Sequence, residues 1–138
     1  MKVKDAMHKG AQWVSPDTSL SEIARLMREH DVGSIPIGEN DRLVGMVTDR
    51  DIVCRGLVNG KDVSKLKARE VMTSGIVFCR AEEDIDDATR TMEEKQVRRL
   101  PVIDKDKRMV GMLSLGDVSA ACDKKQSGEL LQAVSSHH

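Results

Sequence analysis

The sequence predicts an α/β fold made of two tandem copies of one unit. Residues 4–57 return about 65 positions later, with one extra residue in the second copy. Each copy contains an amphipathic helical pattern and then two short apolar segments separated by a polar turn, and this combination of helices and short strands indicates an α/β architecture. A repeat that holds several elements buries its apolar face against its twin, so we expect a pseudo-twofold module.

The first helix of each copy has a start signal in the sequence. Ser19 and Glu22 form the Ser-x-x-Glu pattern of a capping box, and Asp84 can cap the matching helix of the second copy. The apolar residues that follow have helical spacing. They are Leu20, Ile23, Ala24 and Met27 in the first copy and Ile85, Ala88 and Met92 in the second.

Short apolar segments and their turn residues predict the remaining elements, giving the order strand, helix, strand, strand, helix in each copy. Proline lacks a ladder donor, so Pro36 and Pro101 are expected at strand starts or edges. The predicted strands are Val14, 34–38 and 43–48 in the first copy and 76–78, 100–104 and 109–114 in the second, and the predicted second helices are 50–57 and 117–122.

These elements divide the chain into four parts. We expect the first repeat at 1–60, a solvated, charged linker at 61–67, the second repeat at 68–122 and a C-terminal tail at 123–138. The tail is expected to fray, with one alternative: Leu130, Leu131 and Val134 have the spacing of an apolar helical turn that docks back.

Composition excludes several classes of function. The 22 basic and 23 acidic residues give a net charge of −1, and aromatic residues make up 1% of the chain, so no nucleic acid partner is expected. No apolar run reaches the length of a membrane span and no signal peptide is visible, so no membrane partner and a cytoplasmic location are expected. His8 and His30 lack metal-ligand spacing, and Cys54, Cys79 and Cys122 contain no Cys-x-x-Cys pair, so no metal site is expected.

The most specific local pattern is a glycine, two apolar residues, a hydroxyl, two residues and an aspartate. It places Thr48 and Asp51 in the first copy and Ser114 and Asp117 in the second at the start of a predicted helix. One interpretation is helix capping. The other is a ligand site, because a helix start favours an anion and a carboxylate accepts hydrogen bonds from both hydroxyls of a ribose.

The two copies differ in positive charge beside this pattern. Arg98 and Arg99 precede the second-copy strand where the first copy has Gly33 and Ser34. Guanidinium groups match phosphate oxygens, so the two sites should be unequal, although a solvated surface pair explains the arginines equally well. No nucleophile elbow, phosphate-binding loop or histidine-linked carboxylate pair is present, so no catalytic residues and no enzymatic activity are expected.

Taken together, the duplicated unit, the Val-x-x-Ile-Pro and Val-x-x-Leu-Pro segments and the paired hydroxyl-x-x-Asp motifs resemble a CBS-domain pair, or Bateman module. The match is to stand-alone CBS-pair proteins of the hypoxic-response type. It implies two CBS repeats, a disk-like homodimer and a role in stress response. It also implies regulatory binding of AMP, ADP, ATP or S-adenosylmethionine in clefts between the repeats, with no required cofactor.

The resemblance also assigns roles to individual residues. Asp51 and Asp117 correspond to ribose-binding aspartates, Thr48 and Ser114 to the hydroxyls beside them, and Val77 to a wall of the adenine site. Arg98 and Arg99 correspond to a phosphate-binding pair, and Arg50 is a further cation for the first copy. Because no catalytic domain is attached, such a module acts on a protein partner in trans. The alternative is a dimeric protein-interaction module whose clefts are structural and which has no physiological nucleotide ligand.

Overall fold

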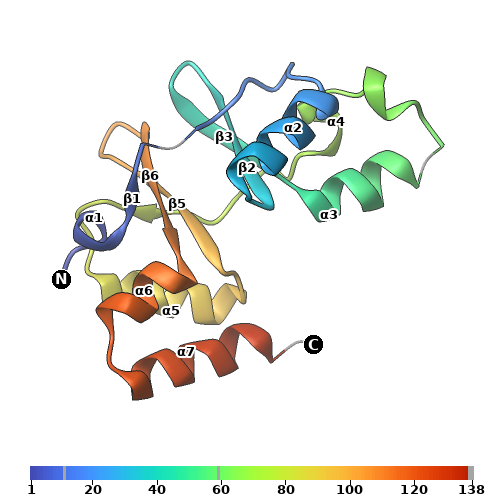
Figure 1. The fold of residues 1–138 in the computed structure, drawn as a ribbon. Coiled ribbons are helices and arrows are strands. Elements are labelled where there is room, and N and C mark those ends of the chain that lie inside the picture. Colours follow the sequence, from blue (N-terminus) through green and yellow to red (C-terminus); the bar gives the residue numbers. More distant parts are fainter. Residues whose placement is uncertain (11, 59, 137–138) are drawn as a thin grey trace. The chain divides into compact units, whose positions relative to one another are not determined.

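The computed structural model describes residues 1–10, 12–58 and 60–136, which form two compact units (Figure 1). Unit 1 comprises Met1–Ala11 and Val77–His138, and unit 2 comprises Gln12–Ile76. Both units combine helices with strands, so the predicted mixed α/β fold class is confirmed. Among the described residues, no helix has both the length and the apolar character needed to cross a bilayer.

Unit 2 contains a two-stranded antiparallel hairpin and the helices around it. β2 and β3 pair with Ile35 opposite Val47, and Val14 adds a single parallel bridge to Ile37. The elements are α2 (Leu20–His30), β2 (Ser34–Glu39), β3 (Arg42–Thr48), α3 (Asp49–Asp51), its π-helical continuation η1 (Ile52–Leu57), the 3-10 turn η2 (Val63–Lys65) and α4 (Ala68–Val71).

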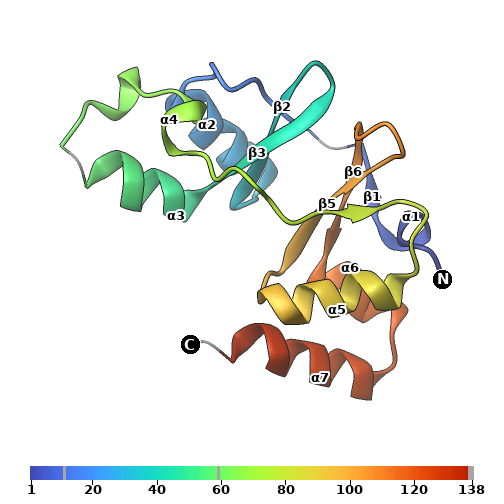
Figure 2. The same cartoon turned by 180° about the vertical axis from the view of Figure 1, so that it is seen from behind.

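Unit 1 contains a four-stranded sheet in the order β1-β6-β5-β4. β4 runs parallel to β5, whereas the other pairs are antiparallel (Figure 2). The elements are α1 (Val3–Ala6), β1 (His8–Lys9), β4 (Cys79–Arg80), α5 (Ile85–Lys95), β5 (Arg99–Ile103), β6 (Met109–Ser114), α6 (Leu115–Ala121) and α7 (Lys124–Ser135).

Both predicted helix starts are confirmed. The Ser19 hydroxyl accepts from the Glu22 amide at 3.2 Å, and the Asp84 carboxylate accepts from the Asp86 amide at 2.8 Å. The Glu22 carboxylate bonds to Arg25 instead of returning to the Ser19 backbone, so the full capping box is not formed there. Each of these helices ends at a residue in the left-handed region, which stops the helical hydrogen bonding.

Two details of the strand prediction are wrong. The second-copy strand lies at Cys79–Arg80 and not at 76–78, because only Cys79 and Arg80 pair with β5. Pro101 lies inside an interior strand of the sheet. It is tolerated because the pairing with β4 begins one residue later, at Val102, so no ladder bond on that side requires the missing N–H.

The first residues of each sequence repeat, which we call its leading segment, pack with the helices and strands of the other repeat. α1 and β1 precede the first repeat's body but belong to unit 1, where β1 pairs with β6. Conversely, α4 and Thr73 lead the second copy but lie in unit 2, where Thr73 and Met46 exchange two backbone hydrogen bonds of 2.9 and 3.1 Å. The boundaries of the sequence repeats and of the compact units therefore differ.

A glycine lies where each leading segment pairs with a strand, and the contact is closest at Gly111. A Cβ added to Gly111 would lie 2.4 Å from the His8 carbonyl oxygen and 2.9 Å from the Met7 sulfur. At the equivalent Gly45 it would lie 2.8 Å from the Met72 sulfur. The repeated glycine of the hydroxyl-x-x-Asp pattern thus permits the close approach of two backbones.

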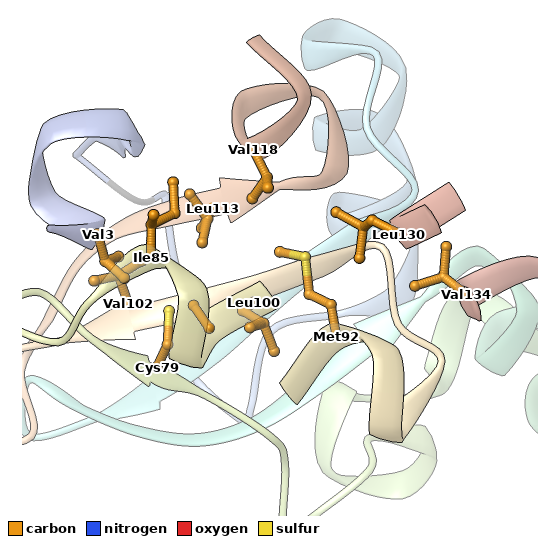
Figure 3. Close-up of a cluster of buried hydrophobic side chains, with 11 residues drawn as sticks. Val3, Cys79, Ile85, Met92, Leu100, Val102, Leu113, Val118, Leu130 and Val134 are labelled. Atoms are coloured by element: carbon orange, nitrogen blue, oxygen red, sulfur yellow. The ribbon is translucent and has the colours of Figure 1, made fainter. Parts of the chain in front are cut away.

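Each unit has its own apolar core. The core of unit 1 gathers residues from α1, β4, α5, β5, β6, α6 and α7 (Figure 3). Its buried members are Val3, Cys79, Ile85, Ala88, Met92, Leu100, Val102, Leu113, Val118, Leu130 and Val134. The core of unit 2 contains Leu20, Ile23, Met27, Ile35, Ile37, Val47, Leu66, Ala68 and Val71.

Two predicted surface segments contribute to these cores. The tail is not frayed at 124–135, because α7 buries Leu130 and Val134 completely against α5 and α6 while Leu131 faces solvent. Residues 137 and 138 of the tail lie outside the described residues. The linker is not wholly solvated either, because Leu66 is buried in the core of unit 2.

Replacing Gly111 with alanine should destabilise the protein, because the new methyl group meets a backbone carbonyl that cannot move aside. We expect a loss of about 1–3 kcal/mol in the free energy of unfolding, measured by urea denaturation. The matched control is Gly128→Ala in α7, where a Cβ meets no atom within 4 Å. This control should gain about 0.5–1 kcal/mol. Equal stability of the two variants would contradict the close-approach explanation.

The buried thiol of Cys79 should make stability depend on alkaline pH. Burial, with a smaller contribution from the Glu83 charge, raises the pKa of Cys79 to about 12. The neutral thiol is favoured in the folded state, so its contribution is present below the unfolded pKa of about 8.5 and is lost as pH rises towards 12. Between about pH 9 and 10.5 the wild type should lose more unfolding free energy than Cys79→Ala, by up to about 1.4 kcal/mol per pH unit. Cys54→Ala, at an exposed position, should follow the wild type.

Candidate functional site

The two hydroxyl-x-x-Asp motifs form the same capping box in the two units. In unit 2 the Thr48 hydroxyl accepts from the Asp51 amide at 3.0 Å, and the Thr48 amide donates to Asp51 Oδ2 at 3.0 Å. In unit 1 the corresponding distances between Ser114 and Asp117 are 3.0 and 2.9 Å. The capping interpretation is therefore realised at both positions, and it uses the backbone amides of both aspartates.

Capping occupies only one oxygen of each carboxylate. Oδ2 accepts the backbone bond, and Oδ1 faces a basic side chain: Arg55 Nε lies 3.8 Å from Asp51 Oδ1, and His8 Nδ1 lies 2.9 Å from Asp117 Oδ1. The side chains of Asp51 and Asp117 are only 14% and 10% exposed. Each unit thus holds a nearly buried carboxylate with a defined orientation and an outward-facing acceptor oxygen.

The sheet of unit 1 brings three of the other predicted residues to the same strand end. Arg99 is the register partner of Ser114, and the Leu115 amide donates to the Arg98 carbonyl oxygen at 2.7 Å. Both arginine side chains are exposed. Arg98, Arg99, Ser114 and Asp117 therefore lie together at the junction of β5, β6 and α6.

The equivalent junction in unit 2 has a different charge. Ser34 is the register partner of Thr48, and the Asp49 amide donates to the Gly33 carbonyl oxygen at 2.9 Å. A Cβ on Gly33 would lie 3.1 Å from the Asp49 carboxylate, and the Ser34 hydroxyl is buried with no hydrogen-bond partner among the described residues. An acidic group thus lies where unit 1 has exposed arginines.

Two predicted residues are less closely joined to these junctions. Arg50 is exposed beside Asp51 at the start of α3, where its amide donates to Asp49 Oδ1 at 2.8 Å. Val77 is half-buried and packs against the core of unit 1. It precedes β4, which is separated from β6 by β5 in the order of the sheet.

The structure adds residues that sequence reasoning missed. His8 was considered only as a metal ligand, yet it contacts Asp117 because β1 pairs with β6. Trp13 and Phe78, the chain's two aromatic residues, lie at equivalent positions, one residue before Val14 and Cys79, and their exposed fractions are 37% and 38%. Alignment of the two copies would have revealed the aromatic pair, whereas the position of His8 required the pairing of strands.

The described residues contain no group of three or more His, Cys, Asp or Glu side chains placed to hold a metal ion. Of the three cysteines, Cys54 is exposed, Cys122 is half-buried and Cys79 is buried. Burial raises the pKa of Cys122, as it does that of Cys79.

Comparison with known sequences identifies the repeated unit. The family model of the CBS domain matches residues 3–57 and 68–124. Hypoxic response protein 1 of Mycobacterium tuberculosis is 38% identical over 134 residues, which cover 96% of this chain and 93% of that protein. The CBS domain-containing protein YhcV of Bacillus subtilis is 37% identical over 134 residues, covering 96% of this chain and 94% of that one.

Solved structures of CBS-domain proteins share the fold. Hypoxic response protein I, with two coordinated zinc ions, matches with a TM-score of 0.81 at 40% identity, covering 89% of this chain and 100% of that chain. CBSX2 in complex with AMP matches with a TM-score of 0.75 at 29% identity, covering 87% and 94%. The CBS domain pair of protein MJ0100, in complex with 5′-methylthioadenosine and S-adenosyl-L-methionine, matches with a TM-score of 0.77 at 26% identity, covering 88% and 94%.

Removing one capping hydroxyl should reveal what the box contributes to folding. Ser114→Ala leaves the Asp117 amide without its acceptor, so we expect a loss of about 0.5–2 kcal/mol in the free energy of unfolding, measured by urea denaturation. Ser21→Ala, at an exposed position within α2, is the control and should change stability little. A Ser114→Ala variant as stable as this control would show that the cap contributes nothing.

Proposed function

This chain belongs to the CBS domain family, with two CBS domains in tandem, and on that basis we propose that it is a non-enzymatic regulatory module that binds adenosine-containing ligands. The observation that carries the proposal is the oriented carboxylate in each unit, Asp51 or Asp117, which keeps an acceptor oxygen directed away from its capping bond. Related CBS proteins hold AMP, or 5′-methylthioadenosine with S-adenosylmethionine, and this supports the same ligand class here.

In this proposal the carboxylate binds the ribose. A carboxylate has about four lone-pair positions, so one bond from the capping backbone amide leaves acceptor capacity for the two hydroxyls of a diol. The capping box holds the carboxylate in place before the ligand arrives, which reduces the ordering cost of binding. Thr48 and Ser114 hold the aspartates, and Val77 supplies an apolar contact for the base in unit 1.

The two sites should prefer different ligands. Arg98 and Arg99 at the unit 1 junction favour a phosphate, because a guanidinium forms paired, charge-assisted hydrogen bonds with its oxygens. In unit 2 the Asp49 carboxylate beside Gly33 repels a phosphate, and Arg50 only partly offsets this charge. We therefore assign AMP, ADP or ATP to unit 1 and an adenosyl ligand without phosphate, such as S-adenosylmethionine, to unit 2.

The regulatory output is proposed to reach a separate protein. CBS-pair proteins are generally regulatory and non-catalytic, and the family matches of this chain indicate no catalytic family. Ligand binding would then change the affinity of the module, acting as a cytoplasmic homodimer, for a partner in trans. A ligand shifts such an equilibrium only by its difference in affinity between the two states.

Calorimetric titration with AMP, ADP, ATP and S-adenosylmethionine tests the proposed function. Asp117→Asn keeps an acceptor for the capping amide but removes the negative charge, so it should weaken AMP binding at least about tenfold, and Asp51→Asn should do the same for the unit 2 ligand. Asp106→Ala, in the turn between β5 and β6, is the control and should bind like the wild type. No binding of any of the four ligands at millimolar concentration would contradict the proposal.

The arginine pair should discriminate phosphorylated from unphosphorylated ligands. Charge-assisted hydrogen bonds are worth about 1.5–3 kcal/mol each, so the double variant Arg98→Gln/Arg99→Gln should lose at least about tenfold in AMP affinity and little in adenosine affinity. The control Lys105→Gln/Lys107→Gln removes the same charge from the turn at the opposite end of the hairpin. Equal losses for AMP and adenosine would rule out a phosphate contact.

A second candidate is a dimeric protein-interaction module without a physiological nucleotide. Two observations favour it: the capping boxes explain both aspartates without a ligand, and Val53, Leu57 and Val58 expose more than half of their surface on and after η1. Affinity capture with and without nucleotide separates the two candidates. Recovery of one partner irrespective of nucleotide favours the interaction module, whereas ligand-dependent recovery favours the regulatory one.

A further inference from the structure

His8 occupies the outer side of the Asp117 carboxylate. The β1–β6 ladder fixes its backbone, with His8 opposite Met112 and Lys9 opposite Gly111, and the Gly10 amide donates to the Val110 carbonyl oxygen at 3.1 Å. His8 Nδ1 lies 2.9 Å from Asp117 Oδ1. The carboxylate is 10% exposed and the imidazole 79% exposed, so the histidine lies between a nearly buried acceptor and solvent.

Few other charges face this pair within unit 1. β6 carries no charged residue, and Asp117 is the one charged residue of α6. In α1, Lys4 pairs with Glu82 and Asp5 accepts from the Lys2 amide. The adjoining strands carry Lys9, which follows on β1, and the exposed side chains of Arg98 and Arg99 at the β5 end beside Ser114. Among the described residues, His8 is the basic side chain in contact with Asp117.

In unit 2 a different basic residue faces the equivalent carboxylate. The Asp51 carboxylate faces Arg55, one helical turn further along, and Thr73 holds the position that matches His8. Arginine keeps its charge at all relevant pH values, whereas histidine is the side chain that changes its charge between about pH 5 and 8. The Asp51 carboxylate therefore faces a permanent cation, whereas the Asp117 carboxylate faces an imidazole.

From this difference we infer that His8 makes ligand binding at Asp117 dependent on pH. The protonated imidazole pairs with Oδ1, the oxygen that the capping bond leaves open, and competes there with the hydroxyls of a diol. Loss of the proton to solvent removes the charge attraction and leaves at most a neutral hydrogen bond, which a diol hydroxyl displaces more easily. This inference rests on the proposed function of the unit 1 site and adds a regulator to it. Ion pairs with an exposed partner are weak, so the effect on affinity is about threefold to fivefold.

Adenosine is the suitable probe, because it lacks a phosphate whose own titration would obscure that of His8. Adenosine affinity is measured by calorimetry at about pH 5.5 and pH 8 in an Asp51→Asn background, so that the unit 2 site contributes little. We expect binding to be about threefold to fivefold weaker at the lower pH, and His8→Gln to remove this difference. His30→Gln, at the exposed C-terminal end of α2, removes a different histidine and should leave the difference unchanged.

Each outcome separates the role of His8 from the proposed function of the site. If adenosine binding is lost in Asp117→Asn but its pH dependence survives in His8→Gln, the role of His8 is overturned and the proposed function stands. The role of His8 is also overturned if binding is independent of pH, or is tighter at the lower pH. If adenosine does not bind, the role of His8 is overturned, whereas the titration with AMP still decides the proposed function. If adenosine binds equally well to Asp117→Asn, the proposed function of the unit 1 site fails and the role of His8 fails with it.

Discussion

The backbone contact at Gly45 and Gly111 is the constraint on which much of the rest of the structure depends. At each glycine, a leading segment crosses the strand of the other repeat so closely that a Cβ would collide with a carbonyl oxygen or a sulfur. The crossing brings α1 and β1 to unit 1 and α4 and Thr73 to unit 2. The same segments carry Val3 and Val71, which are buried in the two cores.

The same contact also positions a functional group. Because β1 pairs with β6, His8 stands beside the carboxylate at the end of that strand. The matching segment in unit 2 places Thr73 at the equivalent position, and Asp51 instead faces Arg55 of its own helical segment. The two carboxylates therefore share the same capping geometry but have different charged neighbours.

The bonds that stabilise each helix start also involve the carboxylate that we propose as a ligand site. A Ser or Thr hydroxyl and an aspartate close the helix start, and the same bonds hold the carboxylate in a fixed orientation. Capping is therefore compatible with the proposed ligand binding, because it uses one oxygen of the carboxylate and leaves the other. The differences between the units lie outside the box, in Arg98 and Arg99 on one side and in Gly33, Ser34 and Asp49 on the other.

Local sequence determined the elements and the repeated motif. The spacing of apolar residues, the caps Ser19 and Asp84 and the hydroxyl-x-x-Asp pattern depend on neighbours within a few positions. The two main helices of each copy, both hairpins and the fold class were therefore predictable, whereas α1, α4 and α7 were not. The inequality of the two junctions was also visible, since Arg98 and Arg99 have no counterpart in the first copy.

Only the tertiary structure decided which segment belongs to which unit. Several features depend on contacts between residues far apart in the chain: the exchange of leading segments, the contact of His8 with Asp117, and the burial of Leu66, Leu130 and Val134. The position of Pro101 inside a sheet depends on the order of the strands. Periodicity reports which face of an element is apolar, but it does not report which partner covers that face. The sequence alone therefore determined two related junctions with unequal charge, and the pairing of β1 with β6 decided that His8 faces Asp117.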